Sequence, residues 1–245
     1  MMAEDFSGQT VIVTGAASGI GLSQAKLFLD NNATVVALDN NEIPLRNSNL
    51  HTLIGDVSDI STFDKLRELI QSLSGKVDVV CNTAGVLDDY RNAIDTSVNQ
   101  WNDTIQTDLT SQFLMIKAVL PIMLEQNHGV FVNMASIAGL VAGGGGIAYT
   151  AAKHAVIGMT KQLDIDYAGR GIRANCIAPG AIDTPMNAAD FAGDGKMAKW
   201  VANETPAKRW ATPDEVAELS LFLASKRSDY IHGGVVPIDG GWTAK

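Results

Sequence analysis

Short apolar segments alternate with longer amphipathic ones along the chain. The apolar segments read TVIVTG, ATVVALD, HTLIGDV, VDVVCNTAG, GVFVNMAS, RANCIAPG and GVVPIDGG, and most end in small or polar residues. Helical patterns lie between most of them, at residues 20–31, 60–73, 97–123, 149–168 and 213–224. Thr212 is the expected N-cap of the last helix, because Pro213 and acidic residues follow it. The pattern predicts buried parallel strands connected by helices.

Strands and helices that alternate in this way are typical of an α/β domain with a parallel sheet covered on both faces. No linker, repeat or low-complexity boundary divides the chain, so we expect one domain over residues 1–245. In such sheets ligands bind outside the carboxyl ends of the strands. The residues that follow each apolar segment are therefore the candidates for a functional site.

Composition narrows the class of protein. The chain has 245 residues, of which 46% are hydrophobic, and this is enough for a sizeable core. Its net charge is -9, and no cluster of Lys and Arg favours a nucleic-acid or anionic-membrane partner. Residues 129–152 carry no charge, but their Asn, Ser and Gly residues favour a strand and a loop over a membrane span. The first residues contain no long apolar run, so we expect a cytoplasmic protein.

Cysteine and histidine suggest no special chemistry. Cys81 and Cys176 lie inside apolar segments, where a small buried thiol is expected and a disulfide framework is not. The histidines lack the spacing of metal ligands, so we expect no metal; they are His51, His128, His154 and His232.

The first strand ends in a glycine loop, read as VIVTGAASGIGLSQAKLFL. Gly15 ends the strand, and Gly19 and Gly21 open the helix, in a G-x-x-x-G-x-G spacing. Glycines at such a turn permit a tight bend and a close approach of the backbone to a pyrophosphate, which the helix N-terminus attracts. A purely structural turn is the alternative, but the position between the first strand and the first helix favours a nucleotide site.

Asp39 ends the second strand, roughly twenty residues beyond the glycine loop. A carboxylate there can accept hydrogen bonds from the adenosine ribose and would repel a 2'-phosphate. No Arg or Lys occupies residues 15–21 or 40–42 to neutralise that phosphate. The sequence therefore favours NAD over NADP, although a turn-capping role for Asp39 is the simpler alternative.

A tyrosine and a lysine lie four residues apart in YTAAK, so Tyr149 and Lys153 share one face of the predicted helix. An amphipathic helix with a solvated lysine would show the same spacing. A phenol with its ordinary pKa of about 10 is a poor base near neutrality, and a neighbouring ammonium would lower that pKa. Hydride transfer at an alcohol needs such an acid/base within reach of the oxygen.

The order and spacing of TGAASGIG, GDVSD, CNTAG, NMAS, YTAAK and APGAIDTPM resemble those of the short-chain dehydrogenase/reductases, nearly end to end. The resemblance implies a Rossmann-type, doubly wound sheet of about seven strands with helices on both faces, and NAD(H) at its carboxyl edge. It implies Tyr149 as general acid/base, Lys153 on the nicotinamide ribose and Ser136 on the substrate oxygen. The implied cofactor contacts, besides Asp39, Tyr149 and Lys153, are Gly15, Ser18, Gly19, Ile20, Gly21, Asp56, Val57, Asn82, Ala84, Gly85, Pro179, Ile182 and Thr184.

Three positions depart from the family pattern. Asp108 stands in DLTSQF where the family has Asn, whose carbonyl serves a lysine-bound water and whose side chain holds a helix kink. Asp108 is therefore a catalytic candidate that we expect to change the pH profile. Thr83 replaces the usual second Asn after the fourth strand, and the short chain between Asp39 and Asp56 predicts a loop in place of a helix.

Substrate identity is open at this level. Residues 187–210 occupy the place of the family's substrate lid, and VLDDY and GGGGIA are expected to line the same pocket. The lid cations could attract an anionic substrate or be solvated, and we favour the second; they are Lys196, Lys199, Lys208 and Arg209. We expect NAD and a secondary alcohol or ketone of the sugar, polyol or hydroxy-acid type.

Two alternatives stay open. A 3-oxoacyl-(acyl-carrier-protein) reductase would benefit from a basic rim and usually uses NADPH. A cofactor sensor or scaffold without catalysis would not need Ser136, Tyr149 and Lys153 together. The family further implies a homotetramer, with the long helices at 97–123 and 149–168 paired between subunits.

Overall fold

Seven parallel strands form one sheet in the order β3-β2-β1-β4-β5-β6-β7. The computed structural model describes residues 4–245. The strands are β1 Thr10–Thr14, β2 Thr34–Asp39, β3 Leu50–Ile54, β4 Val79–Asn82, β5 Gly129–Met134, β6 Ile172–Pro179 and β7 Val235–Ile238. The first three strands follow one another from β1 toward one edge of the sheet, and the last four follow one another from β4 toward the other edge. The strands β1 and β4 are therefore neighbours at the switch point. The predicted Rossmann-type α/β fold is confirmed.

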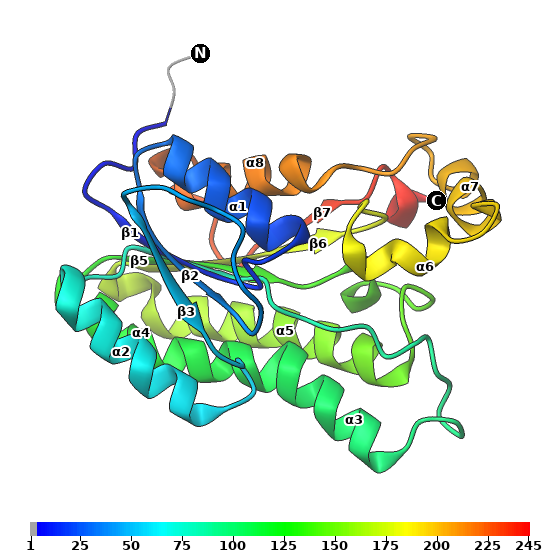
Figure 1. The fold of residues 1–245 in the computed structure, drawn as a ribbon, viewed down its shortest axis with the longest axis horizontal. Coiled ribbons are helices and arrows are strands. Elements are labelled where there is room, and N and C mark those ends of the chain that lie inside the picture. Colours follow the sequence, from blue (N-terminus) through cyan, green and yellow to red (C-terminus); the bar gives the residue numbers. More distant parts are fainter. Residues whose placement is uncertain (1–3) are drawn as a thin grey trace.

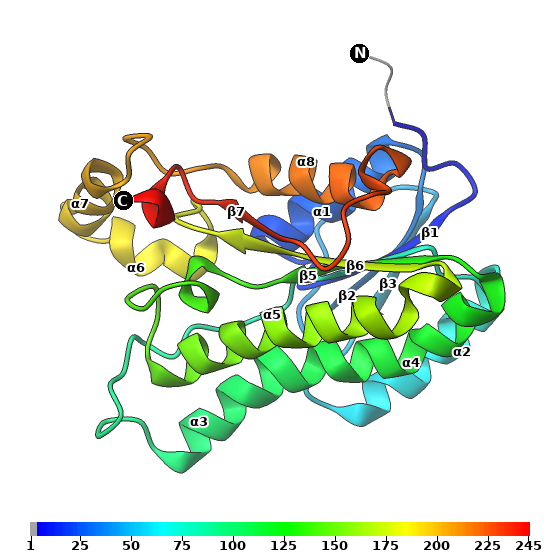
Figure 2. The same cartoon turned by 180° about the vertical axis from the view of Figure 1, so that it is seen from behind.

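Helices cover both faces of the sheet (Figures 1 and 2). One face carries α1 Gly19–Asp30 and α8 Pro213–Ala224, which pack on each other. The other face carries α2 Ile60–Leu73, α4 Ser111–Gln126 and α5 Ile147–Tyr167, with α3 Val98–Ile105 leading into α4. The short helices α6 Ala188–Phe191 and α7 Lys196–Glu204 lie together at one end of the molecule, beside the C-terminus.

The alternating side chains of β1 show how the two cores arise. Val11 and Val13 are buried under α1 and α8, whereas Ile12 is buried under α2 and α4 on the opposite face. Side chains on a strand alternate between faces, so an uninterrupted apolar strand supplies both cores at once. This explains why the strand segments of the sequence read as apolar runs.

Most predicted elements occur within a few residues of their expected bounds. Thr212 caps α8 in a capping box with Glu215, as its sequence predicts. Residues 40–49 contain no helix, which confirms the expected loop. Cys81 and Cys176 are buried free thiols. The prediction that every strand is buried is wrong for β3 and β7, which are partly exposed because they form the two edges of the sheet.

One continuous helical run, Val98–Gln126, is long and apolar enough to meet the criteria for a membrane span. It comprises α3, a π-helical turn at Gln106–Thr110, and α4. Met115, Val119 and Met123 on α4 are buried against the sheet. The run is therefore a helix of the protein core, in which apolar residues face β-strands and neighbouring helices.

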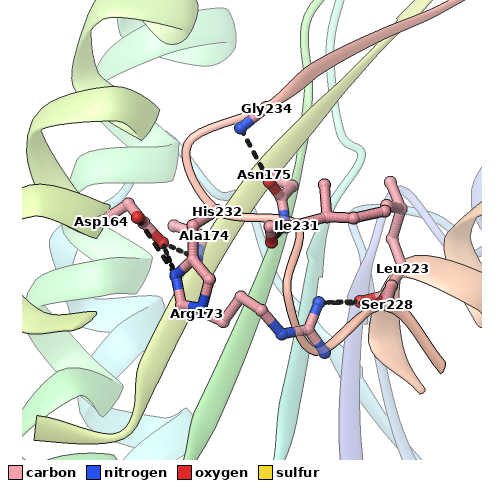
Figure 3. A network of polar contacts seen from close by, with 9 residues as sticks. All are labelled: Asp164, Arg173, Ala174, Asn175, Leu223, Ser228, Ile231, His232 and Gly234. Atoms are coloured by element: carbon pink, nitrogen blue, oxygen red, sulfur yellow. Dashed lines mark hydrogen bonds and ion pairs between the residues drawn. The ribbon is translucent and has the colours of Figure 1, made fainter. Parts of the chain in front are cut away.

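Polar side chains of α5 and β6 fix the segment that leads to β7 (Figure 3). Asp164 accepts a hydrogen bond from the Ala174 amide at 2.9 Å and contacts His232 Nδ1 at 2.9 Å. Arg173 is buried and satisfied by acceptors in and after α8, namely the carbonyls of Leu223 and Ser225 and the hydroxyl of Ser228. The Asn175 side chain donates to the Ile231 carbonyl and accepts from the Gly234 amide. These hydrogen bonds fix the segment between α8 and β7.

Candidate active site

A cavity of about 870 Å³ opens at the carboxyl ends of the strands. Its wall is built from the turns after β1, β2, β3, β4, β5 and β6, the start of α5, and the lid residues of α6 and α7. It contains every predicted site residue except Asn82 and Asp108: Gly15, Ser18, Gly19, Ile20, Gly21, Asp39, Asp56, Val57, Ala84, Gly85, Ser136, Tyr149, Lys153, Pro179, Ile182 and Thr184.

The glycine loop has the shape that a dinucleotide needs. Gly15 has a φ of +69°, which side-chain-bearing residues rarely adopt. A Cβ on Gly21 would lie 2.2 Å from the Gly15 carbonyl oxygen, so only glycine lets α1 begin this close to β1. Ser18, the N-cap of α1, makes no capping hydrogen bond through its side chain, and the first turn of α1 has no acidic residue. The loop therefore presents a helix N-terminus that suits a pyrophosphate.

Asp39 lies at the same end of the cavity and has two local roles. Its Oδ2 accepts a hydrogen bond from the Ala17 amide at 2.9 Å, which ties it to the glycine loop. Its Oδ1 accepts from the Asn41 amide at 2.8 Å, as a turn residue does. Asp39 also lines the cavity, so the turn interpretation and a ligand contact are compatible. Among residues 4–245, Lys153 is the only lysine or arginine in the cavity wall.

Ser136, Tyr149 and Lys153 come together further along the cavity. Ser136 follows β5, and its Oγ accepts a hydrogen bond from the Ala138 amide at 3.1 Å. Tyr149 and Lys153 lie one turn apart on α5, with the Lys153 Nζ 5.3 Å from the centre of the Tyr149 ring. That Nζ donates to the Met134 carbonyl at 3.2 Å. Because only 2% of Lys153 is exposed, the alternative of a solvated lysine does not hold.

The pKa of Tyr149 differs from the sequence-based expectation. Burial raises it, the charge of Asp108 raises it further, and a hydrogen bond with Ser136 acts in the opposite direction. Taking a phenol out of water disfavours the phenolate more than a lysine ammonium at this distance offsets. Tyr149 therefore keeps its proton at neutral pH in the protein alone, and the lowering of its pKa expected from Lys153 together with the oxidised nicotinamide stays a prediction.

Asp108 lies behind the cavity wall, fully buried in the π-helical turn. Its Oδ1 accepts a hydrogen bond from the Val86 amide at 2.7 Å, and its backbone carbonyl accepts from Gln112 Nε2 at 3.1 Å. Its Oδ2 has no partner in the part of the chain that the structure describes. Burial raises the pKa of Asp108, and the charge of Lys153 opposes this. The helix distortion thus forms without a side-chain amide.

The Asn82 side chain does not line the cavity. Asn82 pairs with Asn133 on the neighbouring strand, and its Nδ2 donates to the Asn133 Oδ1 at 2.9 Å. Asn133 in turn donates to the Thr160 hydroxyl of α5 at 3.0 Å. A buried amide must find partners, and these are inside the sheet rather than in the cavity. Asn82 therefore supports the floor of the site from below.

Sequence reasoning missed the role of Asp88. Its Oδ1 accepts from the Gly146 amide at 2.7 Å and its Oδ2 from the Tyr149 amide at 2.9 Å. Asp88 therefore caps the first turn of α5 from a loop that is distant in sequence. A Cβ on Gly146 would lie 2.5 Å from the Asp88 Oδ2, which explains one glycine of the GGGG run. The acid in VLDDY was the available signal, but nothing in the sequence indicates its partner.

Comparisons with known proteins agree with this geometry. The family model described as Enoyl-(Acyl carrier protein) reductase matches residues 15–243. Dehydrogenase/reductase SDR family member 6 of Rattus norvegicus is 36% identical over 244 residues, which is 96% of this chain and 98% of the relative. The 3-oxoacyl-(acyl-carrier-protein) reductase FabG of Thermotoga maritima is 34% identical over 248 residues, with coverage of 96% and 97%. The structure of ElxO with NADP bound has a TM-score of 0.90 and 28% identity, covering 97% of this chain and 99% of that one.

These matches extend over nearly the whole chain, and they include the glycine loop and the residues around Ser136 and Tyr149. The cavity brings the glycine loop together with Ser136, Tyr149 and Lys153. The chain therefore belongs to the short-chain dehydrogenase/reductase family, as an oxidoreductase that acts on CH-OH groups with a nicotinamide dinucleotide.

Proposed function

We propose that this protein interconverts a secondary alcohol and its ketone with NAD(H), with Tyr149 as the general acid/base. The observation that carries the proposal is the meeting of Ser136, Tyr149 and Lys153 in one cavity with the glycine loop. A protein that only sensed or bound a dinucleotide would not need a phenol, a hydroxyl and an ammonium at its inner end.

Each side chain has a part that follows from its chemistry. Ser136 would hydrogen-bond the substrate oxygen, and Tyr149 would exchange a proton with it. Because its pKa is raised in the protein alone, Tyr149 is protonated at neutral pH, which is the state that reduction of a ketone requires. In this cavity the nicotinamide would supply or accept the hydride. Lys153, which is buried and donates to the Met134 carbonyl, supplies positive charge beside Tyr149 and would bind the nicotinamide ribose, as the family resemblance implies.

The preference for NAD rests on charge. Asp39 lines the adenosine end of the cavity, and none of the residues lining that end is a lysine or arginine within the described range 4–245. A 2'-phosphate there would face a carboxylate without a cation to offset it. ElxO, a structural relative, has NADP bound, so the fold itself does not select NAD and the proposed preference rests on Asp39.

Parallel fluorescence titrations with NADH and NADPH test this preference. We expect NADH to bind at least roughly tenfold more tightly, about 1.4 kcal/mol, and Asp39→Ser to reduce the difference. Asp56→Asn is the matched control, because Asp56 lines the same end but would affect both cofactors alike. Equal or tighter binding of NADPH to the wild-type protein would make Asp39 a turn residue only.

A 3-oxoacyl-(acyl-carrier-protein) reductase is the second candidate, favoured by the description of the matching family model and by the FabG relative. An acidic carrier protein and its phosphate-bearing arm would need cations near the cavity mouth. Rates with an acetoacetyl thioester and NADPH would distinguish the two candidates, since our proposal expects little reduction of that substrate. The homotetramer and the cytoplasmic location stay predictions, and the first is open to size-exclusion chromatography with light scattering.

A further inference from the structure

The substrate end of the cavity has an apolar and aromatic wall. Beyond Tyr149 its large side chains are Leu87, Tyr90, Ile137, Met186, Met197, Trp200, Val201, Trp210 and Trp242. They come from four separate parts of the chain: the loop after β4, the turn after β5, the lid and the C-terminal segment. Trp210 is fixed, because its indole packs on Phe191 with ring centres 4.8 Å apart and donates to the Ala198 carbonyl.

The cations of the lid face away from this wall. Lys196 pairs with Asp194 at 2.7 Å, and Lys199 donates to the Asp194 carbonyl at 3.2 Å. Arg209 makes a two-pronged pair with Glu215. None of these residues lines the cavity, and neither does Lys208, which donates to the Asn203 carbonyl. The structure thus favours the solvated interpretation of these side chains.

The C-terminal lysine is also occupied. The Lys245 Nζ lies over the Trp242 ring, 4.1 Å from the ring centre, and donates to the Glu204 carbonyl at 2.8 Å. It is not part of the cavity wall. Of the described residues, then, Lys153 alone brings positive charge to the cavity, and the proposed function already uses it.

Few polar side chains remain for the substrate. Asn187 already donates to the Ile182 carbonyl at 2.8 Å. The others are Asp190, the Tyr90 hydroxyl and the indole N–H groups of Trp200 and Trp242. Burial, and then the charge of Asp190, raise the pKa of Tyr90. A carboxylate at this position repels an anionic substrate. A polyol would lose the hydration of several hydroxyls against a wall whose large side chains are mostly apolar or aromatic.

Two glycines of the run before α5, Gly143 and Gly144, also line the cavity and add no side chain to its wall. Tyr90 is held at the mouth by a backbone with a φ of 55° at both Asp89 and Tyr90, a conformation that non-glycine residues adopt only when the surroundings impose it. Flat indole and phenol faces pack best on a flat, rigid partner, which also loses little conformational freedom on binding.

We propose that the substrate is an uncharged, largely apolar ring compound that carries a secondary hydroxyl or keto group. The proposal rests on the proposed function and narrows it. It departs from the sugar, polyol and hydroxy-acid types favoured by the sequence alone, because apolar and aromatic side chains predominate among the large side chains of the wall and Lys153 is the only described cation in it.

A matched substrate pair tests the proposal. The methyl ester of 4-oxocyclohexanecarboxylic acid and the free carboxylate differ in charge and by one methyl group, and each is offered with NADH at neutral pH. A fused two-ring ketone and an open-chain tetritol, the latter with NAD, complete the panel. We expect kcat/KM for the ester to exceed that for the carboxylate by at least roughly tenfold, and the fused ketone to be the best substrate.

Two lid variants test whether the lid wall itself sets the preference between the ester and the carboxylate. Trp200→Lys places an ammonium in the cavity wall, and we expect it to reduce the preference for ester over carboxylate roughly tenfold. Lys199→Ala, its neighbour outside the wall, is expected to leave the preference unchanged. NADH titration of both variants confirms that each is folded and binds cofactor.

The outcomes separate the two proposals. A carboxylate used as well as its ester, or a tetritol used better than all three ring ketones, would overturn the apolar-ring proposal and leave the proposed function intact. Turnover of no panel member by a protein that binds NADH would contradict the proposed function itself. A preference that Trp200→Lys does not change would show that the lid wall does not contact the substrate.

Discussion

Gly145→Ala tests whether the position of Tyr149 controls the chemistry. A Cβ added at Gly145 would lie 2.4 Å from Tyr149 Cδ1 and 3.1 Å from Cγ. Non-bonded carbons rest at about 3.5 Å or more, so the phenol ring must move by about 1 Å. A displacement of that size at a reacting group can cost roughly 10²-fold in rate, or about 2.7 kcal/mol of barrier.

The loop that carries Gly145 has little freedom to yield instead. The amide of Gly146 is bound to Asp88, and the amide of Ile147 donates to the Arg91 carbonyl at 3.0 Å. The ring is therefore the part that moves. Steady-state kinetics of ketone reduction should show a fall in kcat of roughly 10²-fold, with NADH affinity nearly unchanged because the substituted residue lies outside the cofactor end.

Gly158→Ala is the matched control on the same helix. A Cβ at Gly158 would meet no atom within 4 Å, so alanine there should keep full activity and stabilise α5 by about 0.5–1 kcal/mol. Wild-type kcat in Gly145→Ala, with the protein folded by circular dichroism, would refute the reasoning that the placement of the Tyr149 ring limits the rate.

Two further substitutions test the electrostatics and the support of the site. The charge of Asp108 raises the pKa of Tyr149, so Asp108→Asn should lower the pKa of Tyr149. The rise of kcat/KM for alcohol oxidation with pH should then move to lower pH by roughly one unit. An unchanged pH profile would remove Asp108 from the mechanism. Asp88→Asn leaves one of two backbone amides, that of Gly146 or that of Tyr149, without an acceptor. The change should lower the free energy of unfolding, measured by thermal unfolding, by about 1–3 kcal/mol and should lower kcat. The same change at the exposed Asp89 should cost little, and equal losses would argue against a specific cap.

The sheet and the main site residues were predictable because local patterns determine them. Apolar runs such as VDVVCN specify buried strands, and a glycine turn between the first strand and the first helix specifies the cradle around Gly15 and Gly21. The spacing of Tyr149 and Lys153 places them on one helix face wherever that helix lies. These features need no knowledge of distant parts of the chain.

The features that sequence reasoning missed depend on contacts between distant segments. Asp88 and the first turn of α5 are separated by 58 residues, and Asn82 finds its partner only once β4 and β5 lie side by side. The pKa of Tyr149 follows from how deeply the ring is buried, which spacing alone cannot give. The apolar substrate wall likewise joins Tyr90, the lid and Trp242 from separate parts of the chain.

Tracing a deuterium label tests the central claim most directly. NADH labelled with deuterium at C4 is offered with a cyclic ketone, and the alcohol product is analysed by mass spectrometry and NMR. We predict deuterium on the carbinol carbon, no deuterium released to water, and loss of this transfer in Tyr149→Phe with NADH binding retained. Binding of NADH without label transfer to any ketone, or transfer at the wild-type rate in Tyr149→Phe, would contradict the account.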